Sequence, residues 1–379
     1  MKIRIELSSL ASKHQSGVAQ YTRLLSEALA NTEDTLLYGH YFDFLGRQPK
    51  PSLYADTITL EPNYFIPLRI YAKLQSYGLA PAFDILPPLK KKVDLTIFPN
   101  FATWPSLKTG KTAVVIHDLT YIYFPEATEE KNLAHLKRVV PRSVQTADFI
   151  ITVSESVKAE LVKELGVNPE KCITTPIPPA KEFFNPVTPE AINAVKEKYK
   201  IPLNKNYIYF IGNLEPRKNL SSLIKAYRKL PKDTKDAYCL VLAGGRGWKT
   251  EETENTLKEA QDAGEAIYHI GFVDQADSPA LFQGASLFVM PALYEGFGIP
   301  ILEAMASGTP VVAADIPVLR EVGGRAAQYT DTKDPVKFAA VIQNALVATH
   351  DREILRENAE RFSWEDNIQK IINMCHKIN

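Results

Sequence analysis

The 379-residue sequence lacks several features that mark particular classes of protein. Its 44 Lys and Arg balance its 44 Asp and Glu, so the formal net charge is zero. A dedicated nucleic-acid-binding protein carries a basic excess, and the balance argues against that class. The three cysteines stand far apart and form no Cys-x-x-Cys pair. Such sparse cysteine usage is typical of a reducing cytoplasm and predicts no metal site.

Long apolar runs are also missing, since no stretch reaches the roughly 18 apolar residues that cross a bilayer. The N-terminal residues Met1–Leu7 alternate polar and apolar side chains. This alternation predicts a β-strand and differs from the apolar segment of a signal peptide. We therefore expect a cytoplasmic protein, with peripheral binding to the inner membrane face left open.

One region departs from the overall charge balance. From Arg47 to Lys111, nine Lys or Arg stand against four Asp or Glu. Within it, residues 63–92 mix aromatic and apolar side chains with Arg69, Lys73 and a run of three lysines ending at Lys92. Such a mixture is typical of a segment that contacts an anionic membrane. An ordinary insertion with solvated lysines is the alternative.

Short β-rich apolar runs alternate with helical patterns along the chain, which predicts parallel sheets with helices on both faces. At about 100–200 residues per domain, the length predicts two domains. A proline-rich segment after Ile177 marks the boundary. We expect an N-terminal domain at 1–186 and a C-terminal domain at 187–362. Strands are predicted at residues 3–7, 94–98, 112–117, 149–153, 207–211, 238–243, 266–270, 287–290 and 310–313.

Three helices carry clear boundary signals. An apolar stripe follows Gly17, and Ser154 and Gly166 have the residue types of an N-cap and a C-terminal stop. Ser363 is the predicted N-cap of a final helix at 363–379. No strand follows this helix, so its apolar stripe needs another partner, and we expect it to cross back onto the N-terminal domain.

The most informative motif runs from Glu295 to Glu303 and reads Glu-Gly-Phe-Gly-Ile-Pro-Ile-Leu-Glu. A predicted strand precedes it and a helix begins near Ile299, so Glu295 lies in a loop and Glu303 within the helix. The glycines let backbone N–H groups approach a ligand closely. The amides of Phe297, Gly298 and Ile299 lie at a helix N-terminus, which favours anions or sugar hydroxyls. The motif predicts a sugar-nucleotide site; the alternative is a glycine turn with two surface glutamates.

Together with further segments, this motif resembles the retaining glycosyltransferases of family 4, which have the GT-B fold. The further segments are Phe210-Ile-Gly-Asn-Leu-Glu-Pro-Arg-Lys-Asn-Leu220, Leu242-Ala-Gly-Gly245, Ile270-Gly-Phe-Val-Asp274, Ser16-Gly17, His117-Asp118 and Thr152-Val-Ser-Glu155. The resemblance implies an α/β protein with two Rossmann-like, doubly wound parallel-sheet domains that face a central cleft. It implies that the domain at 1–186 lies on the acceptor side and that the domain at 187–362 binds the nucleotide-sugar donor. It is strongest to mannosyltransferase-like members.

The resemblance also implies which groups bind the donor diphosphate. Arg217 and Lys218 stand where family members place phosphate-binding cations, and a guanidinium and an ammonium suit a diphosphate. We expect Lys218 to be exposed, so that its loss reduces turnover with little effect on stability. Many members carry Gly-Arg where this sequence has Gly212-Asn213, so Asn213 occupies that donor-binding position and Arg217 is expected to supply the missing charge.

In the N-terminal half, Gly17, His117 and Asp118 match family positions near the donor. Gly17 would let a helix N-terminus approach the phosphate. His117 follows a predicted buried strand and, in the family, contacts the donor sugar. Asp118 would orient His117 or cap the next turn. A turn glycine and a structural histidine are the alternatives.

In the C-terminal half, Glu303 is expected to accept hydrogen bonds from the ribose hydroxyls, and Glu295 to face the hydroxyls of the transferred sugar. Replacing Glu303 should then weaken nucleotide binding, whereas replacing Glu295 should leave it almost intact. Val273 lies in a loop that family members use to contact the base through the backbone. The sequence has no Asp-x-Asp, and GT-B enzymes lack this metal motif, so we expect neither a divalent metal nor another cofactor.

The reaction implied is transfer of a hexose with retention, with His117, Glu295, Lys218 and Arg217 as the catalytic groups. The route resembles a front-face displacement in which the leaving phosphate takes the acceptor proton. GDP-mannose is the favoured donor, with UDP-glucose and UDP-N-acetylglucosamine open, and the acceptor is a glycan or lipid-linked sugar. The alternatives are a nucleotide-sugar epimerase on the same fold and a non-catalytic sugar-nucleotide-binding scaffold.

Overall fold

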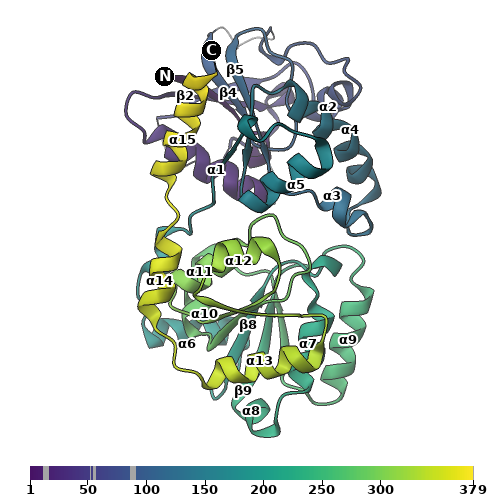
Figure 1. Ribbon diagram of the computed structural model, residues 1–379, viewed down its shortest axis with the longest axis vertical. Coiled ribbons are helices and arrows are strands. Elements are labelled where there is room, and N and C mark those ends of the chain that lie inside the picture. The colour runs from purple at the N-terminus through teal and green to yellow at the C-terminus, as the bar shows by residue number, and fades with distance from the viewer. Residues whose placement is uncertain (12–16, 52, 54–56, 86–90, 379) are drawn as a thin grey trace. The chain divides into compact units, whose positions relative to one another are not determined.

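The computed structural model describes residues 1–11, 17–51, 53, 57–85 and 91–378, and the chain divides into two compact units (Figure 1). Unit 1 comprises Met1–Tyr121, Glu130–Ile177 and Ser363–Asn379, and unit 2 comprises Ile122–Glu129 and Pro178–Phe362. The main division falls at Ile177 and Pro178, within the proline-rich segment, whereas the sequence-based boundary is placed at 186 and 187. Ser16 and Lys90, named in the sequence patterns, lie outside the described residues.

Unit 1 is built on a seven-stranded parallel sheet in the order β3-β2-β1-β4-β5-β6-β7. Chain order reverses between β1 and β4, which is the topological switch point of a doubly wound sheet. The central strands bury runs of Ile, Val and Leu, as strands covered on both faces do. The strands are β1 (Lys2–Glu6), β2 (Leu36–Phe42), β3 (Thr59–Asn63), β4 (Val93–Phe98), β5 (Thr109–Ile116), β6 (Phe149–Thr152) and β7 (Cys172–Thr174).

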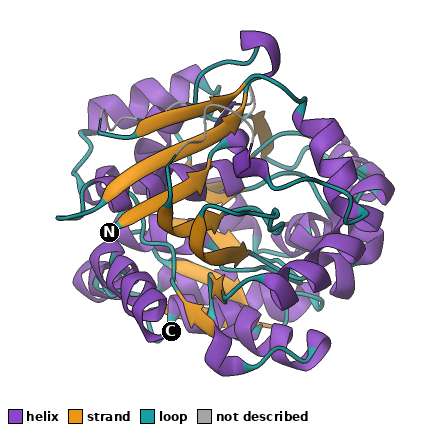
Figure 2. Cartoon of the chain, turned by 90° about the horizontal axis from the view of Figure 1, so that it is seen from above, coloured by secondary structure: helices purple, strands orange, loops and turns teal. Residues whose placement is uncertain are grey.

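Helices cover both faces of this sheet (Figures 1 and 2). They are α1 (Gly17–Ala30), α2 (Leu68–Ser76), α4 (Glu130–Thr146), α5 (Glu155–Leu165) and α15 (Trp364–Lys377), and the short α3 (Thr120–Tyr123) lies where the chain passes to unit 2. The caps predicted for α5 are confirmed. The Val157 N–H donates to Ser154 Oγ at 3.1 Å, and Gly166 ends the helix in the left-handed region with φ 62°.

The final helix, α15, packs in unit 1. Ser363 is its N-cap, as predicted, because its hydroxyl accepts the Asp366 N–H at 3.3 Å. The Asn367 side-chain amide donates to the Pro176 carbonyl at 2.6 Å, just after β7. The Trp364 ring lies 5.9 Å from the ring of Tyr21 on α1. The last helix of the chain therefore contributes to the core around α1 and β7.

Unit 2 repeats the doubly wound plan with six parallel strands in the order β10-β9-β8-β11-β12-β13. Its switch point lies between β8 and β11, which are hydrogen-bonded neighbours. Its strands are β8 (Asn206–Ile211), β9 (Tyr238–Ala243), β10 (Ile267–Gly271), β11 (Leu287–Met290), β12 (Val311–Ala314) and β13 (Ala327–Thr330).

The helices of unit 2 pack on this sheet and complete its core (Figure 1). They are α6 (Pro189–Lys198), α7 (Leu220–Arg228), α8 (Lys232–Ala237), α9 (Glu251–Asp262), α10 (Ser278–Gly284), α11 (Ile299–Ala306), α12 (Pro317–Gly323), α13 (Pro335–Val347) and α14 (Arg352–Glu360). Each strand predicted from the sequence is present, whereas β2, β3, β7 and β13 were not predicted. Among the described helices, none is both long and apolar enough to span a membrane.

Candidate functional site

The geometry of a doubly wound sheet explains why two motifs far apart in the sequence meet in unit 2. Ligands bind such sheets beyond the carboxyl ends of the strands, at the switch point. A single 3₁₀ turn at Pro216–Lys218 follows β8, and the loop that contains Glu295 follows β11. The Leu293 N–H donates to the Arg217 carbonyl at 2.7 Å, which ties the two loops together. The two motifs therefore share one edge of the sheet.

At this edge, two cations and two carboxylates form one cluster. Lys218 Nζ donates to Glu295 Oε1, and Arg217 Nη1 lies 3.1 Å from Glu295 Oε2. On its other side, Arg217 Nε donates to Glu215 Oε2 at 2.9 Å. Glu295 thus bridges both cations, and Glu215 fixes the guanidinium in place. The structure brings together Arg217, Lys218 and Glu295 from the predicted site and adds Glu215, which lies inside the quoted motif but was not singled out.

Burial controls the charges of this cluster. Burial lowers the pKa of Lys218, an effect that the neighbouring Arg217 reinforces and Glu295 opposes. Burial would raise the pKa of Glu295, but the charges of Lys218 and Arg217 outweigh it and the pKa is lowered. Glu295 is therefore an ionised carboxylate held between two positive groups.

The expectation that Lys218 is an exposed cation is wrong. Only 8% of the residue is exposed, because its side chain turns inwards to reach Glu295. A buried ammonium needs a carboxylate partner to offset its lost hydration. Removing Lys218 therefore affects the fold as well as any ligand.

Glu303 occupies a different environment on α11. It is buried, and among the described residues its carboxyl group has no hydrogen-bond partner. Burial, with a smaller effect from the negative charge of Glu182, raises the pKa of Glu303 to about 8. The hydroxyl of the nearby Tyr209 is also buried and has no hydrogen-bond partner in the described part of the chain. Glu303 is therefore a protonated carboxyl at neutral pH, beside polar atoms that lack partners.

The start of α11 is shaped by Gly298. This residue is the N-cap, with φ 100°, a conformation that residues with a side chain rarely adopt. A Cβ there would also lie 2.9 Å from Leu319 Cδ2. No side chain caps the helix, so the backbone around Phe297, Gly298 and Ile299 presents the positive end of the helix dipole.

The remaining predicted positions of unit 2 border the cluster. Asn213 is exposed after β8, and its side-chain amide donates to Glu215 Oε1 at 3.5 Å. Gly244, at the end of β9, packs so tightly that a Cβ would lie 2.0 Å from the Gly212 carbonyl oxygen. Val273 follows β10 and is buried. Because glycines at these strand ends have no side chain, the protein backbone there can approach a ligand closely.

In unit 1, His117 directly follows β5. Its Nε2 lies 2.7 Å from the Pro99 carbonyl oxygen, and Tyr21 and Phe101 pack edge-on against its ring. Burial lowers the pKa of His117, against smaller opposing effects of the Pro99 hydrogen bond and the Asp118 charge. A carbonyl oxygen only accepts, so Nε2 carries the proton of the neutral ring and Nδ1 is an acceptor. This tautomer suits a sugar hydroxyl as donor.

The neighbours of His117 have simpler roles. Asp118 Oδ1 accepts the Thr120 N–H at 2.9 Å, so Asp118 caps the following turn, one of its two predicted roles. Gly17 begins α1 and has open space where a Cβ would stand. Sequence reasoning missed Glu6, a buried carboxyl at the end of β1. Burial, opposed by hydrogen bonds from Ser8, raises the pKa of Glu6 to about 7. Its alternating strand pattern gave no sign that Glu6 faces inwards.

Comparisons with known proteins agree with this architecture. Residues 191–362, which contain the whole cation–carboxylate cluster, match the family described as glycosyl transferases group 1. The chain is 32% identical over 279 residues to the O-antigen chain mannosyltransferase B of Escherichia coli, across 73% of this chain and 72% of the relative. This chain belongs to the group 1 glycosyltransferases. The predicted resemblance to family 4 and its mannosyltransferase-like members is confirmed.

A second relative matches most of the length of this glycosyltransferase. The O-antigen chain mannosyltransferase RfbU of Salmonella typhimurium is 28% identical over 350 residues, which is 90% of each protein. The sucrose-phosphate synthase of Thermosynechococcus elongatus superposes with a TM-score of 0.74 at 18% identity, covering 100% of this chain and 98% of the other. The predicted GT-B fold, with two Rossmann-like parallel-sheet domains, is confirmed, and so is the prediction of a hexosyltransferase at the level of the family.

Proposed function

We propose that this glycosyltransferase moves a mannosyl unit from GDP-mannose to a glycan or lipid-linked sugar in polysaccharide biosynthesis, with retention at the anomeric carbon. The donor proposal is supported by its relatives, which include an O-antigen chain mannosyltransferase 32% identical to this chain. The site proposal is carried by one observation, the buried cluster in which Glu295 bridges Arg217 and Lys218.

The cluster suits a diphosphate because its two cations converge on one carboxylate. Lys218 and Arg217 would bind the phosphate oxygens, a task for which a point charge and a planar fork are complementary. The diphosphate then replaces Glu295 as their counter-ion. Glu295, released from one or both cations, turns its carboxylate to hydroxyls of the transferred sugar. The dipole at the start of α11 adds positive potential from the backbone.

The nucleoside would lie over the other strand ends of unit 2. The backbone at Val273 would contact the base, and the side-chain amide of Asn213 would face the diphosphate. Glu303, protonated at neutral pH because its pKa is about 8, meets the ribose with one donor and one acceptor oxygen. This differs from the purely accepting carboxylate expected from the sequence.

Unit 1 would supply Gly17 at the start of α1 and His117 with its accepting Nδ1, held by Pro99. In the transfer step, the bond from the anomeric carbon to the β-phosphate oxygen breaks. The acceptor oxygen forms its bond on the same face and passes its proton to the departing β-phosphate. The protein positions both reactants and stabilises the phosphate charge. No divalent metal or other cofactor is proposed.

The experiment is an assay of nucleotide release with GDP-mannose, UDP-glucose and UDP-N-acetylglucosamine, each with and without a mannose-containing acceptor, in excess chelator. We expect release from GDP-mannose only with acceptor present, with the transferred sugar found on the acceptor. Equal nucleotide release without acceptor would support an epimerase. Transfer only from a UDP-sugar would overturn the donor proposal, and activity only after magnesium or manganese is added would overturn the metal proposal.

A further inference from the structure

The surface formed by α2 and α4 of unit 1 is rich in positive charge. The segments 64–83 and 131–146 contain Arg69, Lys73, Lys131, Lys137, Arg138 and Arg142 and no Asp or Glu. In the part of the chain that the structure describes, none of these six cations forms an ion pair. Some exposed cations elsewhere, such as Arg320 with Asp315, do have acidic partners. This surface, here called the α2–α4 face, carries uncompensated positive charge.

The cations of α4 form a continuous stripe. Lys131, His135, Arg138 and Arg142 recur at spacings of four, three and four residues, which places them on one side of the helix. That side is turned towards the end of α2, because the Arg138 guanidinium lies 4.7 Å from the ring centre of Tyr77. The helices lie side by side in Figure 1.

Large apolar side chains are exposed on the same face. Ile70 is 53% exposed, Tyr77 59% and Leu79 71%, and Phe65, just before α2, is 58% exposed. Glu130, the first residue of α4, is the only acidic residue in these two helices. Cations and exposed apolar side chains on one surface with so little acidic charge are the features of a surface that lies at a bilayer interface. The aliphatic stems of Lys and Arg add to the apolar contact while their charges meet anionic head groups.

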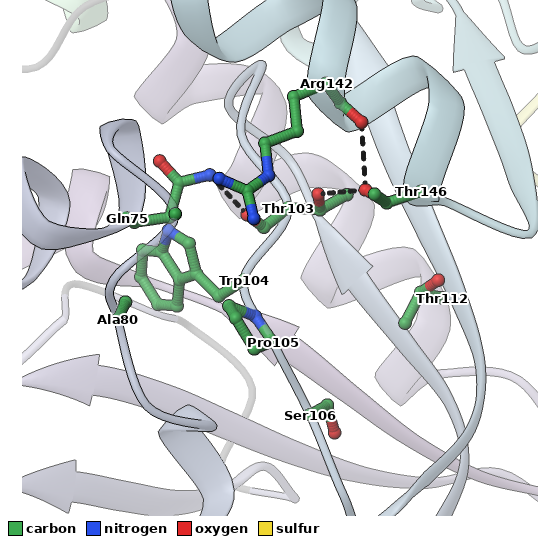
Figure 3. Close-up of a pocket in the computed structure, with 10 residues that line it drawn as sticks. Gln75, Ala80, Thr103, Trp104, Pro105, Ser106, Thr112, Arg142 and Thr146 are labelled. Carbon is green, nitrogen blue, oxygen red and sulfur yellow. Dashed lines mark hydrogen bonds between the residues drawn. The ribbon is translucent and has the colours of Figure 1, made fainter.

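A cavity of about 280 Å³ opens between α2, α4 and the segment after β4. Figure 3 shows Arg142 extending from α4 towards Gln75 and Trp104 at this cavity. Its guanidinium packs on the backbone of Gly78, where a Cβ would meet Nη1 at 2.2 Å. The hydroxyls of Thr103 and Thr146, 2.9 Å apart, also line the cavity. The cavity offers a cation and hydroxyls beside apolar walls, which suits a lipid phosphate and its glycerol.

We propose that the α2–α4 face binds an anionic phospholipid bilayer, with one lipid phosphate held by Arg142 at the mouth of this cavity. The occupant is a lipid surface because both the charge and the exposed apolar side chains are then satisfied at once. Binding depends on neither donor nor acceptor. Its failure would therefore leave the proposed transfer reaction untouched.

The test is co-sedimentation of the full chain with vesicles of phosphatidylglycerol mixed with phosphatidylcholine, and with phosphatidylcholine alone. We expect binding to the anionic vesicles that weakens with salt, and little binding to the neutral ones. The double variant Lys73→Gln/Arg138→Gln should bind roughly thirtyfold more weakly, at about fivefold for each lost cation. Lys232→Gln/Lys258→Gln, with the same charge change on unit 2, should bind as the unsubstituted protein does.

Two further comparisons separate the parts of the proposal. Ile70→Ser/Leu79→Ser should weaken binding at both low and high salt, since it removes apolar contact. Arg142→Gln should weaken binding more than Arg69→Gln, which lies outside the cavity. Unchanged circular dichroism and melting establish that each variant is folded. Equal binding to both vesicle types, or an equal loss of vesicle binding in the unit 2 control, would overturn the proposal. Equal losses of vesicle binding for Arg142→Gln and Arg69→Gln would show that Arg142 does not hold a lipid phosphate at the cavity.

Discussion

At the scale of single residues, the arrangement of Glu295 is the least expected feature of the molecule. The sequence predicts that Glu295 faces the sugar and that Arg217 and Lys218 face the phosphates. In the structure the three groups contact one another. Their meeting follows from the pairing of β8 with β11, two strands far apart in sequence. The motifs predict the residue types of the site, but spacing along the chain does not reveal which charges neutralise each other.

The first prediction concerns Lys218. Lys218→Met leaves Glu295 buried with Arg217 alone, and breaking a buried pair on one side destabilises a protein by about 3 kcal/mol. Chemical unfolding should show this loss together with lost turnover. The double variant Lys218→Met/Glu295→Gln should recover part of the stability, because neither charge then remains unpaired.

Lys225→Met is the matched control for that experiment. Lys225 is exposed and lies 3.7 Å from Glu252, so its loss should change stability by less than about 1 kcal/mol. An equal, small effect for both lysines would contradict the buried ion pair.

The second prediction concerns Glu295→Gln. If a diphosphate must replace Glu295 as the counter-ion of Arg217 and Lys218, the neutral amide removes that competition. GDP should then bind about tenfold more tightly, a change of about 1.4 kcal/mol, while turnover falls because the sugar contact is lost. Calorimetric titration with GDP measures the affinity. Unchanged affinity would instead favour the sequence-based expectation that Glu295 meets only the sugar.

The third prediction is a pH dependence set by Glu303. Its pKa in the folded protein is about 8, against 4.5 for the unperturbed group. The folded state therefore holds a proton that the unfolded state releases, and this contribution to stability is complete below pH 4.5 and is lost as pH rises through 8. Glu303→Gln should remove the dependence. Its melting temperature, relative to that of the unsubstituted protein, should rise between pH 5 and pH 8.

Glu182→Gln provides the control for this titration. It removes the charge that helps to raise the pKa of Glu303 in the folded protein, so the fall in stability should still begin near pH 4.5 but end at lower pH and be smaller. Tyr209, the other titratable group beside Glu303, has a pKa well above its usual range and stays neutral throughout. Parallel melting curves for all three proteins would contradict the raised pKa.

At the scale of helices and strands, the sequence predicts nine strands, including β10 at one sheet edge, and misses the other three edge strands of the described sheets and the interior β2. β3 carries Glu61 and Pro62, and proline is tolerated at a sheet edge where its missing N–H needs no partner. β7 and β13 are short edge strands. β2 is interior but contains Gly39, where a Cβ would lie 2.3 Å from Leu7 Cδ1. Strands with polar residues or a closely packed glycine lack the continuous apolar run by which strands are recognised in the sequence.

The fourth prediction concerns α15. Ile371 on this helix is fully buried, so Ile371→Ala should lower the stability of unit 1 by about 3 kcal/mol through lost contacts and a cavity. Ile354→Ala on α14, where the side chain is 51% exposed, is the control and should change stability little. Urea unfolding followed by circular dichroism compares them. Equal stability of the two variants would mean that α15 does not contribute to the core.

At the scale of the whole molecule, two doubly wound units and the group 1 family establish a glycosyltransferase of the GT-B fold. Both could be anticipated from the order and spacing of many short motifs. Those motifs do not specify the donor, the acceptor or the stereochemistry. The proposed contact to the base is made by the backbone, and the groups proposed to face the transferred sugar would suit several sugars of similar shape.

The central claim is that the chain transfers a mannosyl unit with retention, and the most direct test is the configuration of the new glycosidic bond. GDP-mannose carries an α-linked sugar. Nuclear magnetic resonance of the isolated product reports the anomeric configuration at the transferred residue. We expect an α-linked mannose on the acceptor, since in the proposed transfer the acceptor oxygen enters on the face that the phosphate leaves. A β-linked product would contradict it.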